Sequence, residues 1–133
     1  QRQMCIRDRI DTELSNFYLN TIKDFKNKCS LYIPYKSEIE KIALKKGFSI
    51  IYEVFGDRNY NDDLSLVSRN NENALITDPE SVVNHIKTIK ETETVKTING
   101  NYKKIKFDTI CIHSDTNNSI EILKKINQEF DES

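Results

Sequence analysis

Apolar residues recur along this chain with two periods that alternate. From residue 11 they follow a helical repeat. A strand-length apolar run follows at residues 29–33, and a second helical repeat begins after Ser37. Two more strand-length runs cover residues 48–55 and 108–112. Strands that alternate with amphipathic helices are typical of parallel βα units, so the pattern predicts an α/β fold.

Capping residues set the expected bounds of the helices. The first helix should run from residue 11 to about residue 28, with Asp11 or Thr12 as its cap. Ser37 should open a second helix that Gly47 closes, and Asp78 followed by proline should open a third. The expected inward residues are Leu14, Phe17, Tyr18, Ile22 and Phe25 in the first helix, and Val82, Val83, Ile86 and Ile89 in the third.

A closing helix and a hairpin complete the predicted elements. Thr116 or Asn117 should cap the closing helix, and residues 120, 123, 126 and 130 should form its apolar face. Asn99-Gly100 lies between two alternating stretches within residues 95–107, which is a strong signal for a β-hairpin.

Period-two counting favours a barrel over an open sheet. In the strand at residues 48–55, positions 48, 50, 52 and 54 are apolar, whereas positions 49, 51 and 53 form a mixed face that ends at Glu53. The strand at residues 108–112 has a similar mixed face that ends at His113. In a β/α barrel the apolar faces would lie beneath helices, and the mixed faces would lead to a shared mouth.

Length and charge narrow the class of protein. The 133 residues suffice for one domain, and 20 basic residues are interspersed with 21 acidic ones, which argues against a nucleic-acid or membrane binder. Three cysteines without CxxC spacing favour a reducing cytoplasm. Residues 1–9 show no periodicity and are expected to be a non-native tract, which leaves residues 10–133 as the folded part.

Two groups of side chains could carry chemistry. Glu53 lies near the end of one strand and Asp57 and Arg58 follow that strand. For this group a structural ion pair and a functional site are about equally expected. His113 and Asp115 follow another strand and could form an acid–base pair. His85 is expected to be solvated on its helix. These residues have no spacing typical of a metal site, so no metal ligands are assigned.

Two long motifs resemble those of a known family. Residues 52–69, YEVFGDRNYNDDLSLVSR, are similar to the EVFADRxYxxdGxLvpR signature of the LamB/YcsF family, and residues 110–116, ICIHSDT, are similar to its ICVHGDT. Gly56 replaces the alanine of the first motif, and Ser114 replaces the glycine of the second. A glycine there can adopt positive φ, a conformation in which Ser114 would be strained.

The resemblance implies the C-terminal part of a distorted β/α barrel of the glycoside hydrolase/deacetylase type, with an inserted hairpin. It implies the A subunit of a 5-oxoprolinase, which opens 5-oxoproline to glutamate with ATP and with partner B and C subunits, and an isolated chain of this length would be inactive. By matching motif positions, the expected catalytic residues are Glu53, His113 and Asp115. The expected substrate-binding residues are Asp57, Arg58 and Arg69.

Two alternatives remain open on the sequence. One is a deacetylase-like hydrolase on the same barrel that acts on a carbohydrate amide, with or without a metal. The other is a non-catalytic α/β binding or assembly module, in which Asp57, Arg58 and Arg69 form an interface network.

Overall fold

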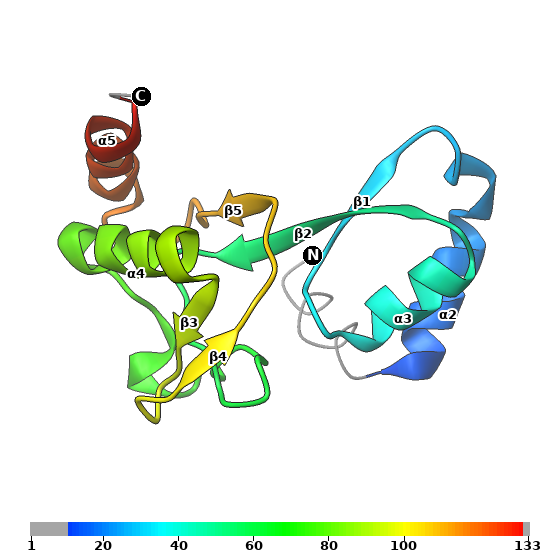
Figure 1. Ribbon diagram of the computed structural model, residues 1–133, viewed down its shortest axis with the longest axis horizontal. Helices are drawn as coiled ribbons and strands as arrows, with labels where there is room; N and C mark the ends of the chain where they lie inside the picture. Colours follow the sequence, from blue (N-terminus) through cyan, green and yellow to red (C-terminus); the bar gives the residue numbers. More distant parts are fainter. Residues whose placement is uncertain (1–10, 132–133) are drawn as a thin grey trace. The chain divides into compact units, whose positions relative to one another are not determined.

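A computed structural model of the protein describes residues 11–131 (Figure 1). The predicted non-native tract at residues 1–9 lies outside the described residues. In chain order the elements are α2 (Thr12–Thr21), η1 (Lys23–Phe25), β1 (Ser30–Ile33), α3 (Glu38–Lys45), β2 (Ser49–Phe55), η2 (Glu72–Ala74), α4 (Pro79–Thr92), β3 (Thr94–Lys96), β4 (Tyr102–Lys104), β5 (Thr109–Cys111) and α5 (Ser119–Phe130). Helices and strands alternate as the apolar pattern predicts. None of the helices within residues 11–131 is long and apolar enough to cross a membrane.

The chain forms two compact units. The described part of the first comprises residues 11–54 and 107–109, and that of the second comprises residues 55–106 and 110–131. One sheet has the strand order β1-β2-β5, and β3 and β4 form a separate pair. β1 and β2 are parallel, with Ser30 opposite Ser49 and Ile33 opposite Tyr52. The predicted parallel βα unit is therefore present, while the extent of the folded domain stays a prediction.

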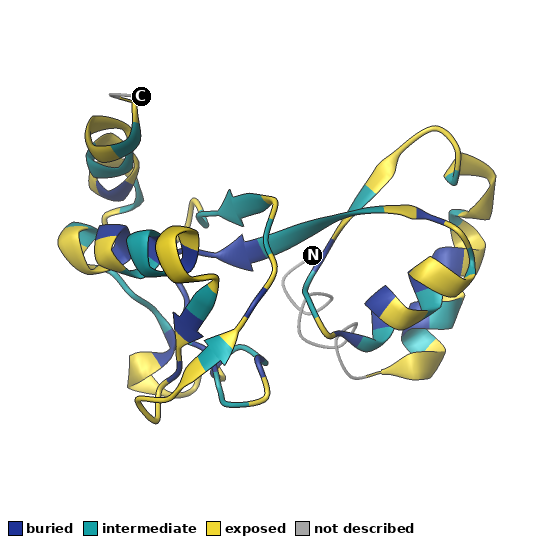
Figure 2. Cartoon of the chain, in the orientation of Figure 1, coloured by how far each residue is buried: buried dark blue, intermediate teal, exposed yellow. Residues whose placement is uncertain are grey.

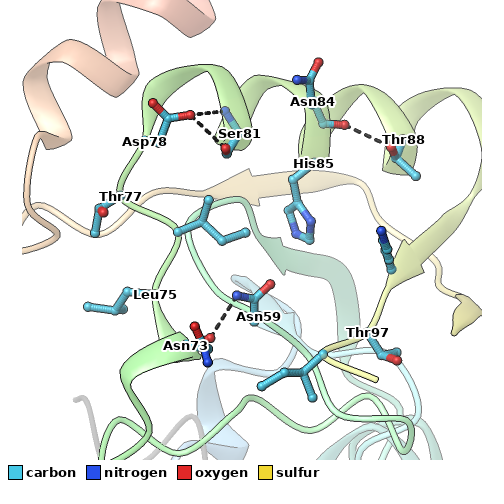
Figure 3. Close-up of a pocket in the computed structure, with 13 residues that line it drawn as sticks. Asn59, Asn73, Leu75, Thr77, Asp78, Ser81, Asn84, His85, Thr88 and Thr97 are labelled. Carbon is cyan, nitrogen blue, oxygen red and sulfur yellow. Dashed lines mark hydrogen bonds between the residues drawn. The ribbon is translucent and has the colours of Figure 1, made fainter. Parts of the chain in front are cut away.

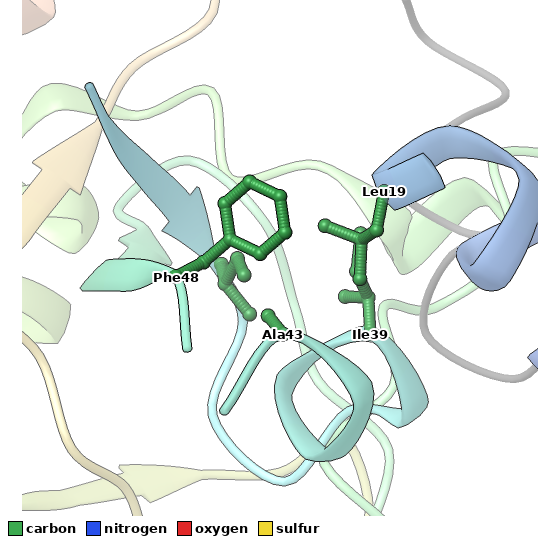
Figure 4. Close-up of a cluster of buried hydrophobic side chains, with 5 residues drawn as sticks. Leu19, Ile39, Ala43 and Phe48 are labelled. Atoms are coloured by element: carbon green, nitrogen blue, oxygen red, sulfur yellow. The ribbon is translucent and has the colours of Figure 1, made fainter. Parts of the chain in front are cut away.

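The core of the first unit is formed where α2 and α3 meet the strands. Its buried members are Leu19, Ile33, Ile39, Ala43 and Phe48 (Figure 4). Ile50 packs against this cluster, so the apolar face of β2 lies beneath helices as predicted. Tyr52 Oη donates a hydrogen bond of 2.7 Å to Glu40 Oε1 of α3, which raises the pKa of Tyr52 to about 12.

The first helix is shorter than predicted, and its predicted face is correct only in part, with Tyr18 and Ile22 packed against the core cluster. Asp11 caps it as predicted, by accepting from the backbone N–H of Leu14, but α2 ends at Thr21. Its buried residues are Ser15 and Leu19, whereas Phe17 is 71% exposed and Phe25 is 56% exposed. The buried pair at i and i+4 is possible because the Ser15 hydroxyl donates to the Asp11 carbonyl at 2.7 Å, which satisfies a polar group inside the core.

The core of the second unit joins α4 to α5. Val82, Val83, Ile86 and Ile89 of α4 are all buried, as predicted, and alternate with exposed residues along the helix (Figure 2). Asp78 caps α4 by accepting from the Ser81 backbone N–H, and proline occupies the first turn. These signals were strong because each one satisfies or removes an unpaired N–H at the helix start.

The start and the buried face of α5 differ from the prediction. The N-cap is Asn118, at φ 64°, and its side chain makes no capping bond. Ile122 is fully buried, with Ile126 and Phe130 packed against the same cluster, whereas Ile120 is 64% exposed and Leu123 is 48% exposed. Residues 122, 126 and 130 follow one another at i+4 spacing, so they form the face that α4 covers.

The predicted hairpin is confirmed. β3 and β4 pair antiparallel, and Gly100 adopts φ +83° in the turn. The Asp62 carboxylate accepts hydrogen bonds from the Thr97 hydroxyl and from the side-chain amides of Asn99 and Asn101, and these bonds lower the pKa of Asp62 to about 2. The backbone N–H of Gly100 donates to the Thr97 carbonyl at 2.8 Å. One carboxylate from the preceding loop therefore fixes the hairpin turn.

Candidate functional site

The end of β2 and the segment after β5 meet around one buried carboxylate. The backbone N–H of Gly56 donates to the Cys111 carbonyl at 3.0 Å, which brings the two segments together. Asp57 then accepts from the His113 backbone N–H through Oδ2 at 3.0 Å, and its Oδ1 lies 2.9 Å from His113 Nδ1. The two residues are 56 positions apart in the chain.

Asp57 is fully enclosed, and its oxygens are occupied by its own chain. It has no exposed surface, and the hydroxyl of Thr116 donates to Oδ2 in addition to the two contacts from His113. Burial alone would raise the pKa of Asp57, but the hydrogen bonds from His113 and Thr116 outweigh it and hold the pKa below its usual value. Asp57 is therefore a carboxylate that orients its neighbours.

The His113 imidazole is held on two sides. Its ring stacks on Phe55 with 5.2 Å between the ring centroids and 18° between the planes, and its side chain is 20% exposed. A carboxylate at Nδ1 favours the tautomer with its proton on that nitrogen, which makes Nε2 the basic position. His113 thus combines a fixed ring with partial access to solvent, as a proton-transferring group requires.

Arg58 is buried beneath the loop that follows it. It is 2% exposed, and its guanidinium donates to the carbonyls of Val67 and Ala74 at 2.8 and 3.3 Å. Burial lowers the pKa of Arg58. Both carbonyls belong to residues 59–76, so Arg58 fixes the path of this loop.

Asp115 pairs with Arg69 instead of His113. Arg69 Nη1 lies 3.3 Å from Asp115 Oδ2, and both side chains are about one-third exposed, at 32% and 31%. The acid–base pair expected between His113 and Asp115 is therefore replaced by a pair between His113 and Asp57. The structure places Arg69 and Asp115 at the surface of the second unit, where a ligand can reach them.

Glu53 lies on β2 in the first unit and is half-buried. The boundary between the units follows Val54, so Glu53 and His113 belong to different units. Its assignment as a catalytic residue stays a prediction. Ser114 is exposed and is not among the described residues with positive φ, so the serine at the motif's glycine position carries no such strain.

Thr116 and His85 are the residues whose positions the sequence did not reveal. Thr116 was one of two expected caps of α5, with Asn117 as the other, but its hydroxyl donates a hydrogen bond to Asp57. His85 was expected to be solvated, but its Nε2 is buried and has no hydrogen-bond partner, and burial lowers the pKa of the imidazole. His85 also stacks on Tyr60, with 6.3 Å between the ring centroids. Within residues 11–131 no group of three or more His, Cys, Asp or Glu side chains could hold a metal ion.

Gly56 permits the close packing that positions Asp57. A Cβ at this position would lie 2.7 Å from Ile112 Cδ1, 3.1 Å from Ile86 Cδ1 and 3.2 Å from Ile110 Cγ2. We expect Gly56→Ala to lower the free energy of unfolding by about 1–3 kcal/mol, because the added methyl overpacks the site. Chemical denaturation monitored by circular dichroism measures this change.

The matched test of this packing is a second substitution. Because Ile112 makes the shortest contact, Gly56→Ala combined with Ile112→Val should recover part of the lost stability. The control combines Gly56→Ala with Ile122→Val, because Ile122 packs in the same core cluster but is not among the near contacts of Gly56. Equal recovery with both valine variants would contradict the proposed overlap with Ile112.

The sequence is similar to that of known proteins over most of its length. The family model described as the LamB/YcsF family matches residues 3–133. The chain is 32% identical over 122 residues to the 5-oxoprolinase A subunit of Pyrococcus abyssi. The aligned segment covers 92% of this chain and 48% of the relative. It is 44% identical over 96 residues to the 5-oxoprolinase A subunit of Campylobacter jejuni subsp. doylei. Here the aligned segment covers 71% of this chain and 37% of the relative. The chain therefore spans at most about half the length of these curated relatives.

A solved structure supports the fold class. The match to the lactam utilization protein of Thermus thermophilus covers 97% of this chain and 51% of that protein's chain, with a TM-score of 0.85 and 22% sequence identity. This likeness confirms the predicted fold, part of a TIM-like β/α barrel, with the hairpin of β3 and β4 inserted. With the family model matching nearly the whole sequence, the chain belongs to the LamB/YcsF family.

Proposed function

We propose that this chain contributes to a 5-oxoprolinase as part of its A subunit, and that the whole enzyme opens 5-oxoproline to L-glutamate. The observation that carries the proposal is the identity of 31–44% with curated relatives of that name. In this proposal the protein works with the B and C subunits in the cytoplasm, and the complex hydrolyses ATP to drive the reaction. No residue of this chain is assigned to ATP.

The proposed role of His113 is proton transfer. Opening the lactam adds a water oxygen to the ring carbonyl carbon and breaks the carbon–nitrogen bond, and the nitrogen leaves with an added proton. Asp57 holds Nδ1 at 2.9 Å, so Nε2 is the nitrogen that accepts a proton from the water and returns it to the departing amine. Glu53 is proposed as a second proton-transferring group, contributed by β2.

The candidates for substrate contact divide by their exposure. Arg69 is 32% exposed, and a substrate carboxylate can replace Asp115 as its partner. Asp57 and Arg58 are buried and already bonded to their own chain, so we propose that they position the site and do not touch the substrate. Asp115 would then keep Arg69 in place until the substrate arrives.

The proposed function is tested on the full-length protein mixed with its B and C partners. We expect release of phosphate from ATP only when 5-oxoproline is added, together with formation of glutamate in equal amount. The control contains the B and C partners without the full-length protein and should show no lactam-dependent turnover. Acetate release from an N-acetylated sugar without any lactam-dependent ATP hydrolysis would contradict the proposal in favour of a deacetylase-like hydrolase.

A further inference from the structure

A polar pocket of about 720 Å³ lies within the second unit. It is lined by Asn59, by Asn73 and residues 75–78, by one face of α4 and by residues 96–98 (Figure 3). The lining contains neither His113 nor Asp57. The volume is in the range of small-molecule sites.

About half of the polar side chains in this pocket are already bonded to the protein. Asn59 donates to the Asn73 carbonyl, Ser81 to Asp78, Thr88 to the Asn84 carbonyl and Thr97 to Asp62. Four other lining side chains make no hydrogen bond or ion pair with any described residue: Asn73, Thr77, Asn84 and Lys96. Three of these are neutral groups with a donor, and the fourth is a cation, so together they suit an anionic group.

The remaining wall presents an acceptor. His85 extends from α4 toward the pocket, and its Nε2 is the one buried side-chain nitrogen or oxygen within residues 11–131 that lacks a partner (Figure 3). A neutral imidazole whose proton is on Nδ1 presents Nε2 as an acceptor. Burial lowers the pKa of His85, so the ring is neutral at pH 7 and Nε2 offers a lone pair.

We propose that this pocket binds a small carboxylic acid that also carries an N–H or O–H group. Lys96 contacts the carboxylate, with help from the free amide and hydroxyl donors, and His85 Nε2 accepts a hydrogen bond from the N–H or O–H group. A buried acceptor without a partner is unfavourable, and a ligand that supplies the missing donor removes this cost. The inference stands on the pocket alone and does not depend on the proposed reaction.

Imidazole nitrogen NMR on the whole chain tests the proposal. The sequence has two histidines, His85 and His113, so each signal can be assigned with one variant. The probes are L-glutamate and 5-oxoproline, and 2-pyrrolidone is the comparator that has the lactam N–H without a carboxylate. We expect a saturable shift of the His85 Nε2 signal with at least one acid, no matching shift of His113, and binding of 2-pyrrolidone at least about tenfold weaker, since a charge-assisted hydrogen bond contributes that much.

Two variants separate the pocket from its surroundings. Lys96→Ala should weaken binding of the acid by about tenfold, the equivalent of about 1.4 kcal/mol. Lys104→Ala removes another exposed lysine of the same hairpin that does not line the pocket, and it should leave binding unchanged. His85→Phe keeps an aromatic ring against Tyr60 and should abolish the binding, which isothermal titration can follow without the His85 signal.

Three results would overturn the inference. The first is the absence of a saturable His85 shift with either acid, which would leave water as the partner of Nε2. The second is binding of 2-pyrrolidone as tight as that of the acids. The third is equal weakening of binding by Lys96→Ala and Lys104→Ala. A lack of lactam-dependent ATP hydrolysis in the assembled complex would bear on the proposed function and not on this binding.

Discussion

Replacing His113 with alanine is expected to reduce 5-oxoproline-dependent ATP hydrolysis by about 10²–10⁴-fold in the full-length protein with its partners. The expectation follows from the fixed imidazole, which Asp57 holds at Nδ1 and Phe55 holds by stacking. Since the ring is 20% exposed and ends a network, its loss should affect turnover more than folding. Steady-state phosphate release and the free energy of unfolding are to be measured on the same samples.

A loop residue provides the matched control for His113. Asn117 lies in the same segment, is exposed and is not part of the Asp57 network, so Asn117→Ala should keep full activity. If His113→Ala keeps the turnover of the unsubstituted enzyme while folding normally, His113 is not the proton-transferring group. If both variants lose activity together, the segment matters only as a whole.

Replacing Asp57 with alanine should have the largest effect on stability, about 2–4 kcal/mol of the free energy of unfolding. The substitution leaves the His113 backbone N–H and the Thr116 hydroxyl without their acceptor in the interior. Asp57→Asn keeps the size and one oxygen, so it should cost less. Urea denaturation at pH 7 measures all three proteins.

The pH dependence of stability should identify the charge on Asp57. Hydrogen bonds from His113 and Thr116 hold the folded-state pKa of Asp57 below its ordinary value of 3.8. The charged form therefore stabilises the fold fully above about pH 4, and this contribution is lost as the pH falls through the lower, folded-state value. The stability difference between the unsubstituted protein and Asp57→Asn should shrink only in that acid range.

Asp63→Asn is the control for this experiment. Asp63 is an exposed carboxylate of the following loop, whose contacts include the Ser65 backbone N–H and hydroxyl. Its replacement should change stability far less than that of Asp57. Equal effects of the two substitutions would contradict the assignment of Asp57 as the central buried carboxylate.

Local signals predicted much of the fold. Asp11, Ser37 and Asp78 each cap the helix that the sequence assigns to them, because a side chain that satisfies backbone N–H groups acts within a few residues. The hairpin at Asn99-Gly100 was also predicted correctly, because its turn is likewise determined by residues that are close in the chain. The predicted faces of the first and last helices were correct only in part, since which face is buried depends on partners elsewhere in the chain.

The sequence named Asp57 and His113 as candidates without pairing them with each other. The motifs identified Asp57, His113 and Asp115, but sequence proximity suggested Asp115 as the partner of His113. In the structure that partner is Asp57, 56 positions away, because Gly56 joins β2 to the segment after β5. Thr116 and His85 were missed because neither a hydroxyl near a helix start nor a single histidine on a helix indicates which buried group it meets.

The hairpin turn also bears on how the protein ages chemically. An Asn-Gly step is prone to deamidation, in which the glycine nitrogen attacks the asparagine side-chain carbonyl and forms a five-membered ring. Here the Gly100 N–H is held by the Thr97 carbonyl and the Asn99 amide by Asp62, so both groups are held in place by hydrogen bonds. We therefore expect the carboxylate that fixes the turn also to slow isoaspartate formation for as long as the chain stays folded.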